Sequence, residues 1–180
     1  MVPVLMVIAF ATGCAQDDDL RPLLEIARGA IIAEVRHENA GIVTGTAPVR
    51  PVFVTIERKG KVIGCRGSLQ TRASSLEAEV ALAARSAAQH DPRYVPLTRK
   101  DLDGFSVTVT VVDRLEGIES VEGLLPEHGL VLTSGERTGV VLPWEGKDPA
   151  TRLKWAFQKA KVNPGSPARL ERMLARRLRG

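Results

Sequence analysis

The feature that most constrains the fold of this chain is the segment 105–112, in which valine and threonine alternate. Successive side chains of a strand point to opposite faces, so this alternation separates two sets of residues. The sets are Val107, Val109 and Val111 on one face and Thr108 and Thr110 on the other. Because β-branched residues favour strands, the segment predicts a sheet with one well-covered face.

Three segments carry the signals of helices. Apolar residues recur at helical spacing over residues 20–37. The sequence Ser74-Ser75-Leu76-Glu77 has the form of a capping box, which opens a second helix that continues to about Gln89. The pair Asp148-Pro149 opens a third helix, because an acidic cap followed by proline is typical of a helix start.

Four further strand-like segments pair into two hairpins. Residues 52–56 and 61–65 flank one turn, and residues 129–133 and 138–142 flank another. Helices and strands are therefore interleaved along 180 residues, a length that suits one domain. The predicted fold class is α+β.

The amino terminus has the pattern of a processing segment. Residues 2–12 are uncharged and almost all apolar, and they are too few to span a bilayer. The sequence Ala11-Thr12-Gly13-Cys14 resembles the end of a bacterial lipoprotein signal. We therefore predict a signal peptide at 1–13, lipidation of Cys14 and a short tether at 14–19. On this interpretation the protein is exported and anchored to a membrane, at the periplasmic or surface face. If the segment is instead an apolar strand or helix, the protein is cytoplasmic.

Positive charge is concentrated at the other end of the chain. From residue 151 onward there are nine Lys or Arg residues and one acid, so this segment carries +8 and the remainder carries −4. Ser166 and Pro167 form a helix start, and the apolar residues after them share one helical stripe: Leu170, Met173, Leu174 and Leu178. We therefore predict a basic amphipathic helix at 163–180. It either adheres to anionic lipid or an acidic partner, or it docks on the core.

Cysteine and histidine usage limits the chemistry that the chain can carry. A lipidated Cys14 cannot pair with Cys65, and a disulfide between them is conceivable only if Cys14 is a free thiol in an oxidising compartment. The histidines His37, His90 and His128 are scattered, and none has metal-ligand spacing with Cys65. No metal site and no cofactor are therefore predicted.

Several short motifs occur together in a fixed order. They are Phe53-Val54-Thr55, Gly64-Cys65-Arg66-Gly67-Ser68, Asp91-Pro92-Arg93-Tyr94, Pro96-Leu97-Thr98, the 107–111 strand, Gly129-Leu130, Gly139 and Leu142-Pro143. In this order and spacing the chain resembles the AMME chromosomal region protein (AMMECR) domain over residues 20–162. The resemblance implies an α+β domain of two subdomains, with an antiparallel sheet, flanking helices and a cleft between the subdomains. It implies no particular reaction, since the biochemical activity of the family is not established.

The motif around Cys65 departs from the family pattern. The family usually reads Leu-Arg-Gly-Cys-Ile-Gly-Thr there, whereas this chain has Ile63 before the Gly-Cys pair and Arg66 after it. An arginine has therefore moved by three positions. On an extended chain, such a shift places its side chain on the other face.

Three interpretations of Cys65 follow from its neighbours. As a nucleophile it would need a lowered pKa, for which Arg66 and a base such as His90 or His128 are the candidates. As part of a binding loop it would let glycine amides approach an anionic ligand. Otherwise it is a small buried thiol whose flanking glycines serve backbone geometry. The candidate binding residues are Gly64, Cys65, Arg66, Gly67, Ser68, Asp91 and Arg93. For Asp91 a structural interpretation stays open, in which it caps the turn or pairs with Arg93.

We expect the protein to bind a small anionic ligand or a protein partner in a cleft near residues 64–68 while tethered to a membrane. One alternative is a cysteine-dependent enzyme that uses Cys65. The other, for a cytoplasmic protein, is a nucleotide- or nucleic-acid-binding module, for which the resemblance implies Memo-type or radical-SAM partners. Aromatic residues make up only 4% of the chain, so base stacking is weakly supported, and an exported protein seldom meets nucleic acid.

Overall fold

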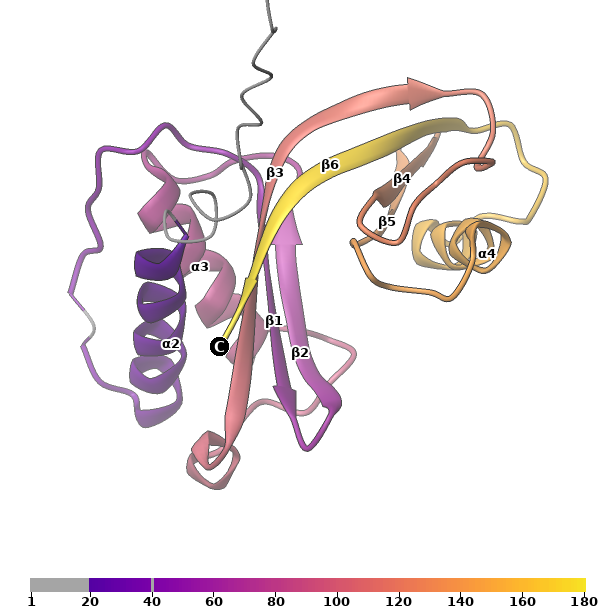
Figure 1. The fold of residues 1–180 in the computed structure, drawn as a ribbon. Coiled ribbons are helices and arrows are strands. Elements are labelled where there is room, and N and C mark those ends of the chain that lie inside the picture. Colours follow the sequence, from indigo (N-terminus) through magenta and orange to yellow (C-terminus); the bar gives the residue numbers. More distant parts are fainter. Residues whose placement is uncertain (1–19, 40) are drawn as a thin grey trace, which may run out of the picture.

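The computed structural model describes residues 20–39 and 41–180. The predicted signal peptide, the tether and the lipidation site Cys14 lie outside the described residues. Helices and strands are interleaved (Figure 1), in the order α2 (Arg21–Arg36), β1 (Val52–Arg58), β2 (Lys61–Ser68), α3 (Leu76–Gln89), the 3-10 helix η1 (Arg99–Leu102), β3 (Phe105–Ile118), β4 (Gly129–Ser134), β5 (Arg137–Val141), α4 (Pro149–Ala160) and β6 (Arg169–Arg179). None of the helices in this part of the chain has the length and apolarity that a bilayer crossing requires.

The six strands of the described chain form one antiparallel sheet with the order β2-β1-β3-β6-β4-β5. The long, curved strands β3 and β6 run side by side across the molecule (Figure 1). They join a first lobe, made of α2, α3, β1 and β2, to a second lobe, made of β4, β5 and α4. The pairing of β3 with β6 shifts register between Val112 and Arg114, and a bulge of this kind increases the local bend. The predicted α+β class and antiparallel sheet are confirmed.

The helices begin and end close to the predicted residues. The Ser75 hydroxyl accepts a hydrogen bond from the Ala78 amide at the start of α3, one residue later than the predicted capping box. At the start of α4 the Asp148 carboxylate accepts a hydrogen bond from the Thr151 amide at 2.8 Å. Each cap satisfies an amide that the helix itself leaves without a partner.

Buried apolar side chains of the described chain form three clusters. The first lies between α2, α3 and one face of β1 and β3, and it contains Val107, Val109 and Val111. The second lies between α4 and the hairpin of β4 and β5. The third joins the lobes, and its buried members are Phe53, Val112, Val131, Leu142 and Met173. This third cluster forms the floor between the lobes.

The strand β3 differs from the prediction in length and in burial. It continues to Ile118, six residues past the alternating segment. Thr108 and Thr110 are also buried, so both faces of the strand are covered rather than one. The reason is its place inside the sheet, where residues opposite on β1 and β6, such as Phe53 and Arg177 beside Thr110, share the threonine face.

The prediction of a basic amphipathic helix at 163–180 is wrong. Residues Arg169–Arg179 form the strand β6, which pairs with β3 on one side and with β4 on the other. Its arginines meet acids on β3 and β1: Arg172 pairs with Glu116, Arg176 with Asp113 and Arg179 with Glu57. These pairs come from distant parts of the sequence, so the local helical stripe could not show them. The last part of the basic segment, Arg169–Arg179, is therefore an interior strand of the sheet.

Candidate functional site

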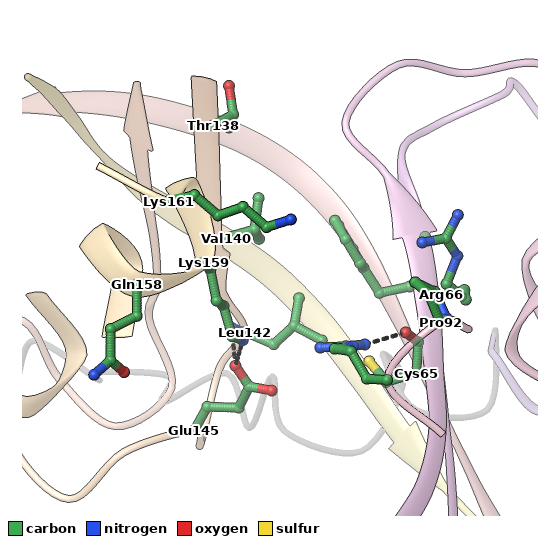
Figure 2. A pocket seen from close by; sticks show the side chains of 13 residues that line it. Cys65, Arg66, Pro92, Thr138, Val140, Leu142, Glu145, Gln158, Lys159 and Lys161 are labelled. Atoms are coloured by element: carbon green, nitrogen blue, oxygen red, sulfur yellow. Dashed lines mark hydrogen bonds and ion pairs between the residues drawn. The ribbon is translucent and has the colours of Figure 1, made fainter. Parts of the chain in front are cut away.

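A cleft of about 530 Å³ lies between the two lobes, and residues of both lobes line it (Figure 2). The first wall comes from β1, β2 and the segment after α3: Phe53, Cys65, Arg66, Gly67, Pro92 and Arg93. The second wall comes from β5, α4 and the segments next to them: Thr138, Val140, Leu142, Glu145, Gln158, Lys159 and Lys161. This is the cleft between subdomains that the family resemblance implied.

The residues predicted as a loop, Gly64 to Ser68, instead belong to the edge strand β2. Gly64 faces α3, where an added Cβ atom would lie 2.2 Å from the carbonyl oxygen of Ala87. At Gly67 an added Cβ atom would lie 2.2 Å from the carbonyl oxygen of Val52. Both distances are far inside van der Waals contact, so close packing requires glycine at these two positions.

The thiol of Cys65 is half-buried on the first wall of the cleft. Burial raises its pKa, and the nearby Glu145 charge adds to this effect, whereas a hydrogen bond from the Thr55 hydroxyl at 3.2 Å opposes it. The two candidate bases lie elsewhere: His90 is 4.0 Å from Glu34, and His128 accepts a hydrogen bond from the Leu125 amide. A protonated thiol without a base is a poor nucleophile. The geometry therefore offers the cysteine-enzyme hypothesis no support.

Asp91 and Arg93 bind the backbone of Cys65 from outside the sheet. The buried Asp91 carboxylate accepts hydrogen bonds from the Cys65 amide at 2.9 Å and from Arg93 Nε at 2.9 Å. Arg93 Nη2 in turn donates to the Cys65 carbonyl oxygen at 2.5 Å. Burial alone would raise the pKa of Asp91, but the hydrogen bonds from Arg93 and from the Cys65 amide outweigh it and lower this pKa. Asp91 thus pairs with Arg93, as the structural interpretation left open for it describes.

The predicted binding residues are thus only partly brought together. Cys65, Arg66, Gly67 and Arg93 line the cleft, whereas Gly64 packs against α3 and Asp91 is buried behind the wall. Ser68 lines a smaller neighbouring pocket of about 250 Å³, which shares Gly67 and three further residues with the cleft, and its hydroxyl accepts a hydrogen bond from the Gln70 amide.

None of the residues of the second wall is among the binding residues predicted from the sequence. Glu145 lies 2.5 Å from the ammonium group of Lys159, and the same carboxylate accepts a hydrogen bond from the Leu142 amide at 3.0 Å. Lys161 follows the end of α4, and its side chain extends across the cleft toward β2 (Figure 2). Lys159 and Lys161 belong to the basic segment that starts at residue 151, and that concentration of charge is the sequence signal for this wall.

The cleft is electropositive. Its lining holds four cationic side chains, Arg66, Arg93, Lys159 and Lys161, against one carboxylate, Glu145. Arg93 and Lys159 are already paired, whereas the side chains of Arg66 and Lys161 form no ion pair or hydrogen bond with a described residue. A cleft lined by one sign of charge concentrates counter-ions. Over residues 20–39 and 41–180, no group of three or more His, Cys, Asp or Glu side chains is placed to hold a metal ion.

Comparison with known proteins agrees with this architecture. The chain is 35% identical over 167 residues to a protein of Aeropyrum pernix, a match that covers 83% of this chain and 71% of the relative. It is 34% identical over 159 residues to a protein of Methanothermobacter thermautotrophicus, covering 81% and 80%. A match to a Methanosarcina acetivorans protein, 36% identical over 100 residues, covers 52% of this chain and 50% of that one.

The crystal structure of protein PH0010 from Pyrococcus horikoshii has the same fold. It superposes with a TM-score of 0.75 at 24% sequence identity and covers 91% of this chain and 92% of that chain. The family model described as AMMECR1 matches residues 24–177, a range that runs from α2 into β6. The chain therefore belongs to the AMMECR1 family.

Proposed function

We propose that this protein binds an anionic ligand in the cleft between its lobes. The observation that carries the proposal is the cationic lining of the cleft, in which Arg66 on β2 and Lys161 after α4 have no ion-pair partner among the described residues. A carboxylate or phosphate group bound in this lining would receive charge-assisted hydrogen bonds from these cations.

The floor of the cleft supports a ligand that is not purely polar. Phe53, Val140 and Leu142 line the same space as the cations. Binding sites typically combine an apolar surface with a few convergent polar groups that fix orientation. The proposed ligand therefore carries an anionic group and an apolar part.

The properties of the cleft thiol favour ligand binding over covalent catalysis. The pKa of Cys65 is raised, and no histidine stands among the described residues that line the cleft. The proposal thus assigns Cys65 to the wall and the recognition of charge to Arg66 and Lys161.

Titration calorimetry with inorganic phosphate and with glutarate at low salt tests this proposal. Arg66→Ala and Lys161→Ala should each weaken binding by about tenfold, because a hydrogen bond to a charged group contributes on the order of 1.5 kcal/mol. Lys154→Ala is the matched control, since Lys154 is an exposed lysine of α4 that does not line the cleft. Equal effects of all three substitutions, or no binding by the unaltered protein, would reject the proposal.

The predicted lipid anchor is a separate proposal, and it would place the cleft at a membrane surface. Mass spectrometry of the protein made in its own host tests it, because an unmodified peptide that runs through Cys14 would exclude the anchor. The result does not affect the test of the cleft.

A further inference from the structure

The two walls of the cleft carry the two open edges of the sheet. In the strand order β2-β1-β3-β6-β4-β5, β2 and β5 each have only one neighbour. The curvature of β3 and β6 brings the two edge strands to opposite sides of one cleft (Figure 1). Gly67 of β2 and Val140 of β5 both contribute to its lining. The sheet is therefore a half-open barrel with a gap between its edges.

The hydrogen bonds of each edge strand show which of its residues direct their N–H and C=O groups away from the sheet. In an antiparallel pair, alternate residues direct their N–H and C=O groups away from the partner strand. The N–H and C=O groups of Cys65 bond to Asp91 and Arg93, so the backbone groups of Cys65 point away from β1. By alternation, those of Gly67 point the same way. The N–H group of Leu142, just beyond β5, bonds to Glu145. By the same alternation the N–H and C=O groups of Thr138 and Val140 point away from β4, at the open edge of β5.

At each edge, the outward backbone groups of one residue already have hydrogen-bond partners. On β2 the Asp91 and Arg93 pair occupies the outward groups of Cys65. On β5 the carboxylate of Glu145, paired with Lys159, terminates the edge at Leu142. Between these closures, the outward N–H and C=O groups of Thr138 and Val140 bond to no described residue. Open edges of this kind are the usual templates for an added strand.

We propose that the ligand of the cleft is an extended acidic peptide segment, which adds to the free edge of β5 as a further strand. The inference rests on the proposed function, since Arg66 and Lys161 would bind its acidic side chains. β5 is the pairing strand because the outward groups of Cys65 on β2 are already occupied. A strand uses both the N–H and the C=O groups of the edge, whereas a small anion uses only the N–H groups. A bound peptide would therefore form hydrogen bonds with more of the outward backbone groups than a small anion would.

The test uses modified peptides, so that the folding of the protein is not disturbed. The probe is the blocked hexapeptide acetyl-Val-Glu-Val-Glu-Val-Glu-amide, followed through the backbone amide resonances of Thr138 and Val140. Three companions complete the set: the same peptide with Gln for Glu, one N-methylated at its odd residues and one at its even residues. Added strands donate from alternate residues, so only one methylated peptide can block pairing.

We expect the acidic peptide to shift both amide resonances and one of the two methylated peptides to bind about tenfold or more weakly than the other. Equal affinity of the two methylated peptides would overturn the inference, and so would equal affinity of the glutamine peptide. If phosphate binding still depends on Arg66 and Lys161 in that case, the proposed function stands and only the peptide is wrong. If neither phosphate nor any peptide binds, both proposals fail.

Discussion

The replacement of Asp91 by alanine tests the construction of the first cleft wall. The carboxylate of Asp91 is 1% exposed, and it holds the Cys65 amide of the edge strand β2 together with the guanidinium of Arg93. Asp91→Ala removes this acceptor. The Cys65 amide is then left without its partner, and the position of β2 relative to the segment after α3 is no longer fixed.

The expected loss of stability can be worked from these contacts. An orphaned buried N–H group costs about 1–3 kcal/mol. The ion pair adds no more than about 1 kcal/mol, because the Arg93 side chain is 51% exposed and water solvates it when its partner is removed. Asp91→Ala should therefore lower the free energy of unfolding by about 1–4 kcal/mol. With a urea dependence of about 2 kcal/mol per molar, the midpoint falls by about 0.5–2 M.

Urea denaturation followed by far-ultraviolet circular dichroism measures this change. Asp113→Ala is the matched control, since Asp113 also pairs with two arginines, Arg50 and Arg176, but lies on the surface. Its loss should cost less than about 1 kcal/mol. An Asp91→Ala protein that is no less stable than the Asp113→Ala protein would refute the reasoning.

The pH dependence of the same pair of proteins gives a second readout. Folding lowers the pKa of Asp91, so the unfolded state binds the proton more tightly than the folded state. The contribution of Asp91 is therefore present above the unfolded pKa of about 3.9, and it is lost as the pH falls through the lower folded pKa. The stability difference between the unaltered protein and Asp91→Ala should be constant near neutral pH and shrink in acid. A difference that grows in acid would contradict this assignment.

Three further predictions concern packing, the last strand and the thiol. Gly64→Ala should lower the free energy of unfolding by about 1–3 kcal/mol, because the added Cβ atom meets the Ala87 carbonyl. Gly117→Ala is the control and should not destabilise the protein, since no atom lies within 4 Å of its added Cβ atom. Equal urea midpoints of the two variants would contradict this. Truncation after Pro164 removes the interior strand β6 and should abolish cooperative thermal unfolding, so a truncated chain that unfolds cooperatively would show that β6 is dispensable. Alkylation of Cys65 by iodoacetamide should reach half its maximal rate above about pH 8.5, and a lower midpoint would revive the nucleophile.

The sequence predicts well those helices and strands that are determined by neighbouring residues. The capped starts of α3 and α4 and the alternating core of β3 lie close to their predicted places, because caps and side-chain alternation are set by neighbouring residues. The strand β6 could not be found in this way. Its residues have high helix propensity and a helical stripe, and the strand is favoured only by pairing with β3 and β4. Arg172 and Arg176 then meet Glu116 and Asp113, which lie about 60 residues away in the chain.

The candidate site was predictable on one wall only. Arg66 and Arg93 belong to motifs that the sequence singles out, and both line the cleft. Lys161 and Val140 carry no motif, and the curvature of the sheet alone brings them opposite β2. The glycine-flanked cysteine suggested accessible amides, yet Gly64 serves the close approach of α3. Glycine in a sequence marks a tight approach without saying whether a ligand or a helix makes it.

The most direct test of the central claim is to map where an anion binds. Amide resonances of the isotope-labelled protein are followed during titration with inorganic phosphate at low salt. Binding in the cleft predicts saturable shifts on both walls, at Arg66 and Gly67 of β2 and at Thr138 and Lys161 of the second lobe. Shifts confined to one lobe, or to arginines of β6 outside the cleft, would contradict the claim that the two lobes form one anion site.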